Sequence, residues 1–286
     1  MTARQVIAAC RQTDASLAAD LPRTAVVAAE SSAPLLSIKG LSVRFGGIVA
    51  LDNVSFDVKA GRICGLIGPN GAGKTTLLNC LSRLYQAGAG TIDFAGERLL
   101  QLRRHRVARL GIGRTFQNLA LFETMSVRNN VLLGGHCHGR SGFVANALRL
   151  PIVCREERLL SERTTGLLEM LELSAIADMP VSALPFWTRK RVELARALAS
   201  EPKLLLLDEP AAGLDHAALG ELSHLIVNIR DRLGITILLV EHHMSLVLRI
   251  SDQVVALDFG RKIADGTPAE VQKNPEVIRA YLGGKL

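Results

Sequence analysis

The chain has few cysteines and no long apolar segment. Five cysteines occur in 286 residues, and no two of them form a Cys-x-x-Cys pair. This odd count, in apolar surroundings, indicates reduced and buried thiols in a cytosolic protein. The longest uncharged apolar runs fall far short of the roughly 18 residues that a transmembrane helix needs. Any work at a membrane is therefore expected to require a partner.

Residues 1–34 lack sustained helix or strand periodicity. They are rich in Ala and Ser, and their apolar stretch Val6 to Cys10 is short and soon interrupted by Arg11 and Asp14. A secretory signal needs a longer apolar centre. The sequence predicts a mobile tail over 1–34, followed by one domain over 35–286.

Aromatic residues are also scarce, at 4% of the chain, whereas the net charge is +7. A cluster of arginines could meet nucleic acid or anionic lipid headgroups. Without interleaved aromatics, however, such a cluster is more often one solvated helix face, and no nucleic acid partner is expected. The cluster consists of Arg98, Arg103, Arg104, Arg106 and Arg109.

A complete Gly-x-x-x-x-Gly-Lys-Thr loop lies between the apolar run 63–67 and a helical pattern over 76–81. The glycines let the loop curl so that its backbone N–H groups point inward. Lys74 can then reach the terminal phosphates, and the Thr75 hydroxyl can ligate Mg²⁺ at the start of a helix. These flanks argue against a chance glycine-rich turn. The predicted nucleoside triphosphate site consists of Gly68, Pro69, Asn70, Gly71, Ala72, Gly73, Lys74, Thr75 and Thr76.

The apolar run 204–207 delivers two carboxylates, Asp208 and Glu209, at its end. Ligands of doubly wound sheets bind at the carboxyl ends of strands. We expect Asp208 to hold Mg²⁺ through water and Glu209 to act on the attacking water. Adjacent acids are often ordinary loop charges, but with the phosphate loop present the catalytic interpretation is favoured, since hydrolysis needs a metal ligand and a base.

The apolar patterns predict an α/β fold. Alternation over 36–39 and 54–58 indicates antiparallel strands, and the uncharged runs 204–207 and 235–240 indicate central parallel strands. Helical spacing over 217–232 completes a βαβ unit in the sheet of the phosphate loop. The predicted fold is a P-loop NTPase-type, mostly parallel sheet with an antiparallel β subdomain.

A helical lobe is expected within this fold, over about 118–200. Helical stretches at 155–173 and 189–199 occur there with few strand signals, which predicts an insertion between sheet strands. Near the end of the chain, Thr267 to Glu270 forms a capping box with proline at the first helical position, and a further short helix starts at Asn274 to Glu276.

From about Leu36 to Leu282, the chain resembles the nucleotide-binding subunits of ABC transporters. The resemblance implies that Phe45 stacks on adenine, that Gln117 senses Mg²⁺ and the attacking water and links to the membrane subunit, and that His242 contacts the γ-phosphate. It also implies that two such subunits enclose two ATP molecules head to tail, with the loop 212–215 crossing to the partner. His243 stands where the family often has an acid, and it receives no role.

The strings Arg114 to Asn118, Met125 to Val127, Gly260 to Ala264 and Tyr281 to Gly283 resemble the ATPases of branched-chain amino-acid importers. The related urea and amide importers share much of this pattern. The resemblance implies transmembrane permease subunits, a second ATPase subunit that is identical or different, and an indirect link to a substrate-binding protein. It implies a peripheral position at the cytoplasmic face of the inner or plasma membrane.

The chain departs from the family at its signature segment. Where the branched-chain group resembles Leu-Pro-aromatic-Gly followed by a polar residue, this chain has Leu184-Pro185-Phe186-Trp187-Thr188. The resemblance places the missing glycine against the γ-phosphate held by the opposite subunit. An indole threatens that close approach, and losing one positioned donor typically costs about 10² to 10³ in rate. Alternatively, Trp187 swings aside into a subunit interface without consequence.

Three functions remain open from the sequence. The first is an ATPase that energises an importer, and the second is an ATP-binding regulatory subunit with little turnover. The third is a soluble ABC ATPase that acts on ribosomes or DNA. It is disfavoured because the chain has one phosphate loop and no long heptad pattern between Lys74 and Asp208.

Overall fold

The computed structural model describes residues 33–116, 119–138 and 151–282. The first strand begins at Leu36. The predicted mobile tail lies outside the described residues up to position 32, and so does Gln117.

A small antiparallel sheet precedes and follows the phosphate loop in sequence. Its strand order is β2-β1-β4-β5, and β1 pairs with β2 from Leu36 opposite Val58 to Phe45 opposite Ile48. The predicted antiparallel strands are therefore confirmed. The strands are β1 Leu36–Phe45, β2 Ile48–Val58, β4 Ala89–Phe94 and β5 Glu97–Arg98.

The larger sheet has the order β10-β9-β3-β8-β7-β6 within the described residues. The strands from β9 to β6 are parallel, and β10 pairs antiparallel at the edge. The predicted central strands at 204–207 and 235–240 are confirmed as the neighbours β7 and β8. The strands are β3 Ile63–Ile67, β6 Ile112–Arg114, β7 Leu204–Asp208, β8 Thr236–Val240, β9 Gln253–Asp258 and β10 Arg261–Gly266.

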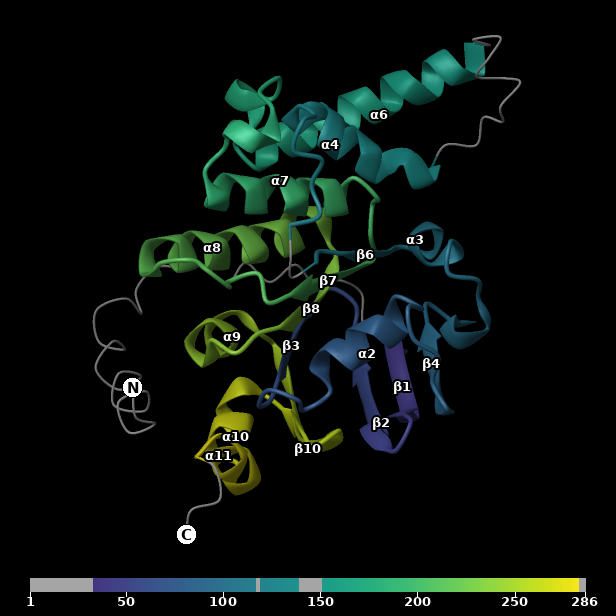
Figure 1. Ribbon diagram of the computed structural model, residues 1–286, viewed down its shortest axis with the longest axis vertical. Coiled ribbons are helices and arrows are strands. Elements are labelled where there is room, and N and C mark those ends of the chain that lie inside the picture. Colours follow the sequence, from purple (N-terminus) through teal and green to yellow (C-terminus); the bar gives the residue numbers. More distant parts are fainter. Residues whose placement is uncertain (1–32, 117–118, 139–150, 283–286) are drawn as a thin grey trace.

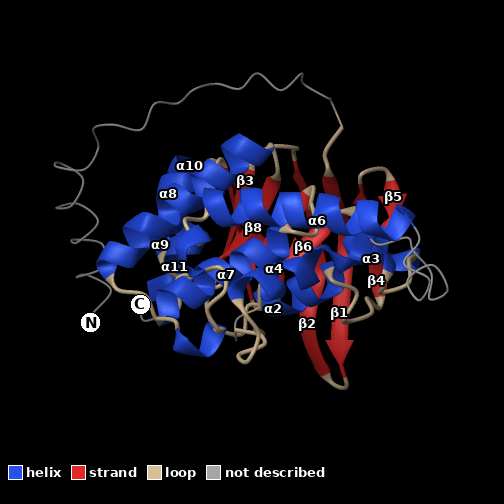
Figure 2. Cartoon of the chain, turned by 90° about the horizontal axis from the view of Figure 1, so that it is seen from above, coloured by secondary structure: helices blue, strands red, loops and turns tan. Residues whose placement is uncertain are grey.

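Two hydrophobic cores cover the two faces of the larger sheet. Alternate side chains of one strand enter different cores, as Leu205 and Leu207 enter one while Leu204 and Leu206 enter the other. The first core includes side chains of α7, α8 and α9, and the second includes α2 and the antiparallel sheet. Figure 1 shows this layering, and in Figure 2 helices α8 to α11 lie at the left and the antiparallel strands at the right.

The described residues between β6 and β7 are helical apart from turns and one isolated bridge between Ser126 and Pro180. Helix α4 packs against α6 and α7. The boundary of the predicted lobe stays a prediction. The elements are α4 Val127–Gly134, α6 Pro151–Met170 and α7 Phe186–Leu198, with short 3-10 helices η2 Gly135–His138, η3 Ser174–Ile176 and η4 Val181–Ala183.

The predicted start of helix α7 at Arg189 is wrong. It begins at Phe186, because the Arg189 N–H donates to the Pro185 carbonyl at 3.0 Å and so closes the first turn over the signature segment. Trp187 therefore lies within the first helical turn. Helix α6 likewise begins and ends earlier than the predicted 155–173.

The remaining helices flank the strands. The predicted helix at 217–232 is confirmed as α8, which Asp215 caps at the start and Gly234 ends. The Thr267 capping box is also confirmed. The elements are η1 Leu99–Gln101, α2 Lys74–Leu81, α3 Arg106–Leu110, α8 His216–Leu233, α9 Met244–Ile250, α10 Pro268–Lys273 and α11 Pro275–Leu282.

Two predictions from composition need correction. The cysteines of the described residues are free thiols, but only Cys64 and Cys80 are buried, while Cys154 is exposed on α6. The arginine cluster is exposed but is not one helix face, because Arg98 belongs to β5 and α3 begins only at Arg106. No helix of the described ranges is long and apolar enough to cross a membrane.

Candidate functional site

The loop between β3 and α2 depends on glycine at both ends. Gly68 has φ +149° and Gly73 has φ +99°. A Cβ atom on Gly68 would lie 2.2 Å from the Leu257 carbonyl oxygen, and one on Gly73 would lie 2.5 Å from that of Ala50. The chain therefore needs glycine at both positions to form this loop.

Lys74 lies inside the loop that it follows. Its ammonium group donates to the carbonyl oxygens of Gly68 at 2.7 Å and Pro69 at 2.9 Å, and the residue is buried. Burial lowers the pKa of Lys74, while the nearby carboxylates of Glu209 and Asp208 act in the opposite direction. The structure thus brings the predicted lysine and both predicted acids together.

The first turn of α2 is open to an anion. It has no side-chain cap and no acidic residue of its own, so no carboxylate within the turn neutralises its amide groups. Thr75 is exposed in this turn and Thr76 is half-buried. This arrangement fits phosphate groups at the helix start, with the Thr75 hydroxyl beside them.

Asp208 is held by a buried ion pair. Arg114 Nη2 lies 3.0 Å from Asp208 Oδ2, and the Arg114 guanidinium also donates to Asn79 and Ser82. In the sequence analysis, Arg114 was named only as part of the string 114–118 that carries the resemblance. The signal was an arginine ending β6, next to the strand that carries Asp208.

Asp208 retains one oxygen for a cation. Its Oδ1 is buried and has no hydrogen-bond partner among the described residues. Carboxylate and hydroxyl oxygens are the ligands that Mg²⁺ prefers. Asp208 and Thr75 therefore fit the predicted metal, while Gln117 lies outside the described residues.

Glu209 follows β7 with a left-handed backbone, at φ +48°. Its N–H donates to the Val240 carbonyl at 2.9 Å, and its side chain is half-buried. This conformation is uncommon for a residue other than glycine, and such strain clusters at functional sites. The predicted base thus comes directly after the strand that ends at Asp208.

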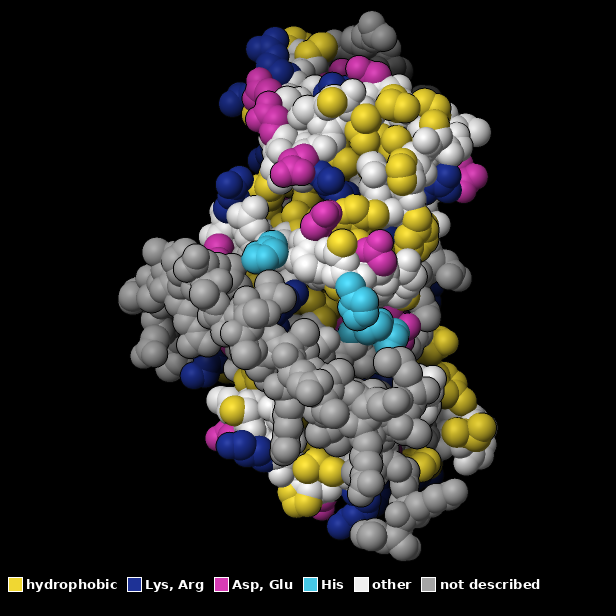
Figure 3. All heavy atoms as spheres, turned by 90° about the vertical axis from the view of Figure 1, so that its left-hand side faces the viewer, with side chains coloured by type: hydrophobic (Ala, Val, Ile, Leu, Met, Phe, Trp, Pro, Cys, Tyr) yellow, Lys and Arg dark blue, Asp and Glu magenta, His cyan; other side chains and the backbone are white. Residues whose placement is uncertain are grey.

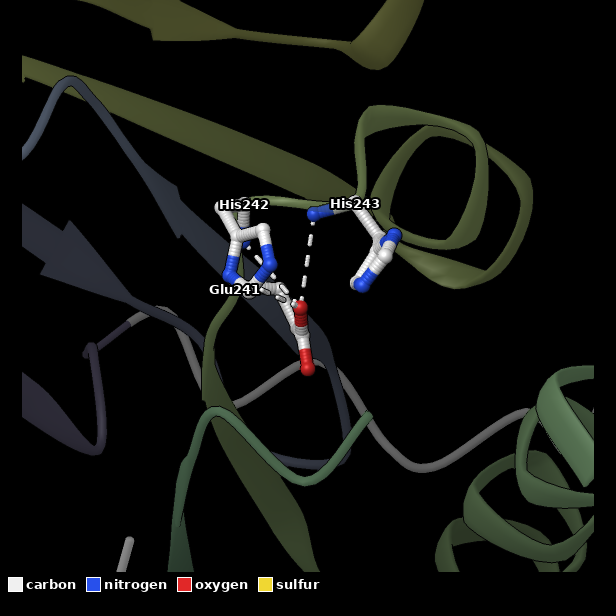
Figure 4. A group of neighbouring side chains, drawn as sticks. All are labelled: Glu241, His242 and His243. Carbon is white, nitrogen blue, oxygen red and sulfur yellow. Dashed lines mark hydrogen bonds and ion pairs between the residues drawn. The ribbon is translucent and has the colours of Figure 1, made fainter. Parts of the chain in front are cut away.

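Glu241 organises the segment that carries His242 (Figure 4). The Glu241 carboxylate is fully buried and accepts from the backbone N–H groups of Ala211 at 2.7 Å, His242 at 3.1 Å and His243 at 3.3 Å. The two imidazole rings lie 4.4 Å apart, and His242 is exposed. Sequence reasoning missed Glu241, whose signal was an acid directly after the apolar strand β8.

These three residues also have the spacing of a metal site, since one ligand atom from each lies within 4.8 Å of the others. Both carboxylate oxygens of Glu241, however, already accept amide hydrogens. The close spacing of the three residues is therefore explained by the hydrogen bonds through which Glu241 positions His242 and the loop that starts at Ala211.

Phe45 presents an exposed ring at the end of β1. Tyr85 contacts it edge to face, with 5.0 Å between the ring centroids. A ring held in this way can offer a face to a flat base. Sequence reasoning did not single out Tyr85, and the predicted role of Phe45 stays a prediction.

The signature segment turns its indole toward α8. Trp187 Nε1 donates to Glu221 Oε2 at 2.8 Å, and the ring contacts the first hydrophobic core. Phe186 lies against Gly213, where a Cβ would be 3.2 Å from the ring. No side chain caps the start of α7, so its first amide groups have no side-chain acceptor. The Trp187 side chain is bonded to the neighbouring helix α8.

Family models match the chain in two places. Residues 51–212 match the ABC transporter model, and residues 261–285 match the model of the branched-chain amino acid ATP-binding cassette transporter.

Characterised relatives are similar over most of the chain. The high-affinity branched-chain amino acid transport ATP-binding protein BraF of Pseudomonas aeruginosa is 41% identical, over 88% of this chain and 99% of the relative. The corresponding protein LivG of Escherichia coli is 42% identical over the same shares.

Solved structures agree. The ATP-binding cassette MJ1267 in its ADP conformation has a TM-score of 0.76 at 31% identity, covering 88% of this chain and 99% of that one. A dimeric cassette, MJ0796 bound to ADP and phosphate, has a TM-score of 0.68 at 25% identity, covering 82% of this chain and 98% of that one.

Proposed function

The chain belongs to the ABC transporter family as an ATP-binding cassette, and we propose that it energises an importer for branched-chain amino acids. One observation carries the ATPase function: Lys74 is held inside the phosphate loop that follows β3, and β7 of the same parallel sheet ends at Asp208, whose buried Oδ1 has no partner among the described residues. The substrate rests on the similarity to BraF and LivG and on the match at residues 261–285. An importer for urea or amides is the alternative substrate class.

Each residue of the proposed site has its own role in ATP binding or hydrolysis. The loop amides and Lys74 hold the β- and γ-phosphates, and Phe45 takes the adenine. Thr75, Asp208 and Gln117 would hold Mg²⁺, which when bound neutralises charge on the phosphates. Glu209 orients the attacking water and accepts its proton as the new P–O bond forms and the bond from the γ-phosphorus to the leaving oxygen of ADP breaks. His242 contacts the γ-phosphate from the loop that follows β8.

The complex we propose contains permease subunits and a second ATPase subunit, with a substrate-binding protein acting through the permease. MJ0796 is described as dimeric, which supports the pairing. Exposed apolar side chains lie in the helical region, including Phe122, Leu133 and Met179. Figure 3 shows apolar side chains gathered toward the upper end of one face, which supports docking of a permease there. We place the chain at the cytoplasmic face of the inner or plasma membrane.

A second function, from a different class, is a regulatory subunit that binds ATP with little turnover. Trp187 in the first turn of α7 favours it, because a bulky residue stands where the resemblance implies a glycine. Single-turnover hydrolysis by the assembled complex separates the two functions. Phosphate release as slow as uncatalysed ATP hydrolysis would support the regulatory function.

The test of the leading proposal is reconstitution with co-purified membrane subunits. Proteoliposomes should take up leucine with ATP inside, and the Lys74→Met variant should abolish both uptake and ATP binding. Uptake of urea but not of leucine would contradict the proposed substrate. If Lys74→Met bound ATP as tightly as the unchanged protein, the proposed nucleotide site would be wrong.

A further inference from the structure

The C-terminal helix α11 contacts the phosphate loop through one phenol. The Tyr281 hydroxyl accepts the backbone N–H of Gly68, the first loop residue, at 2.7 Å. Tyr281 and Gly68 are 213 positions apart in the sequence. The bond therefore joins the end of the chain to the start of the nucleotide site.

The same C-terminal region holds the other end of the loop. The Gly260 N–H, in the turn between β9 and β10, donates to the Ala72 carbonyl at 3.2 Å. The Gly260 carbonyl in turn accepts the Asp52 N–H at 2.8 Å, and Arg261 pairs with the Asp52 carboxylate at 2.7 Å. The loop is thus fixed at Gly68 and at Ala72 by residues that follow β9.

Fixing Gly68 also fixes the lysine. The Gly68 carbonyl accepts a hydrogen bond from Lys74 Nζ, while its N–H is bonded to Tyr281. A Cβ at Gly68 would collide with the Leu257 carbonyl, so the residue already lies close against the end of β9. A shift of Gly68 would therefore displace the ammonium group that meets the phosphates.

Helix α11 has few other anchors. Among its described side chains, only Val277 is buried, and the Asn274 side chain accepts the Glu276 N–H at the helix start. The Tyr281 side chain is 37% exposed, but partial desolvation still raises the pKa of its phenol to about 12, so the phenol stays neutral near neutral pH. The Tyr281 hydroxyl is thus the polar group that ties the last helical turn to the nucleotide loop.

We propose that Tyr281 is a positioning residue for nucleotide binding, through which docking of α11 and occupancy of the phosphate loop stabilise each other. This rests on the proposed nucleotide site. Because such coupling is reciprocal, nucleotide should protect α11, and loss of the hydroxyl should weaken nucleotide binding.

The test compares Tyr281→Phe with the unchanged full-length chain, with Arg279→Ala as a control on an exposed position of the same helix. Removing one hydrogen bond should raise the Kd for ADP and ATP about three- to tenfold, with KM raised similarly and kcat nearly unchanged. Arg279→Ala should match the unchanged chain. Equal Kd values for Tyr281→Phe and the unchanged chain would overturn the proposal.

Hydrogen exchange gives a readout that a merely structural role would not move. Addition of ADP should slow amide exchange in α11 of the unchanged chain but not in Tyr281→Phe. Nucleotide-independent exchange in both proteins would overturn the coupling. The Lys74→Met variant separates the two proposals, because nucleotide binding that survives it would refute the site itself, whereas failure of the Tyr281 test alone leaves the site intact.

Discussion

Arg114 and Asp208 form a buried ion pair at the floor of the nucleotide site, with 3.0 Å between Nη2 and Oδ2. The Arg114 guanidinium also bonds to Asn79 and Ser82, on and just after the helix of the phosphate loop. One arginine therefore connects the strand that carries Asp208, the proposed Mg²⁺ ligand, with the helix that carries Lys74. This connection makes the geometry of the site depend on a residue that is not expected to contact ATP.

Arg114→Met should destabilise the fold strongly. The substitution leaves the Asp208 carboxylate buried without its partner, which typically costs about 3 to 5 kcal/mol. Urea unfolding followed by circular dichroism measures the change. Arg128→Met is the control, since Arg128 pairs with Asp178 at the surface and such pairs contribute about 1 kcal/mol or less. Similar losses in both variants would contradict a special role of the buried pair.

Glu241→Gln should lower kcat more than nucleotide affinity. The amide group of Gln keeps one acceptor oxygen but turns an NH₂ group toward a backbone N–H that the carboxylate now accepts. Hydrogen bonds to charged groups contribute about 1.5 to 3 kcal/mol, so the backbone at His242 should shift or loosen. Steady-state ATPase assays of the assembled complex measure the split. Glu97→Gln, on the exposed strand β5, should change neither kcat nor KM.

The sequence predicted those parts of the site that leave a local pattern. The phosphate loop between β3 and α2 and the strand that ends in two acids each lie within a few consecutive residues, so their spacing alone predicted where they lie in the fold, while their roles stay predictions. The βαβ unit followed from periodicity in the same way.

Contacts between distant segments could not be predicted. The Tyr281 bond to Gly68, the Arg114 pair with Asp208 and the indole bond from Trp187 to Glu221 join segments whose separation leaves no periodic signal. The start of α7 was misplaced for a related reason. Its first turn contains Phe186 and Trp187, which precede the predicted start at Arg189, and tertiary packing against α8 and Gly213 favours the helix there.

ATP binding should take up protons at alkaline pH. Burial lowers the pKa of Lys74 in the free protein, whereas triphosphate oxygens around the ammonium group raise it. Between these two pKa values the free lysine is partly neutral and the bound lysine is charged, so affinity falls as pH rises through the lower value. Calorimetry over a series of alkaline pH values, in two buffers of different ionisation enthalpy at each pH, detects the uptake. Lys74→Arg should remove it, because the guanidinium stays protonated, and identical uptake in both proteins would contradict this assignment.

Trp187→Gly should raise ATP turnover of the assembled complex while the Kd for nucleotide changes little. The substitution removes the indole bond to Glu221 and restores the small residue that the resemblance expects against the opposite γ-phosphate, so the gain can reach about 10²-fold, the cost typical of one misplaced donor. Glycine also weakens the first turn of α7, by about 1 kcal/mol, so thermal unfolding is followed in parallel. Trp187→Phe is the matched control, because it removes the indole N–H but keeps an aromatic ring. If turnover rises only with glycine, the bulk of the side chain causes the defect. If turnover rises equally with phenylalanine, the hydrogen bond between α7 and α8 causes it. If both variants turn over ATP at the unchanged rate, the altered signature segment does not limit hydrolysis.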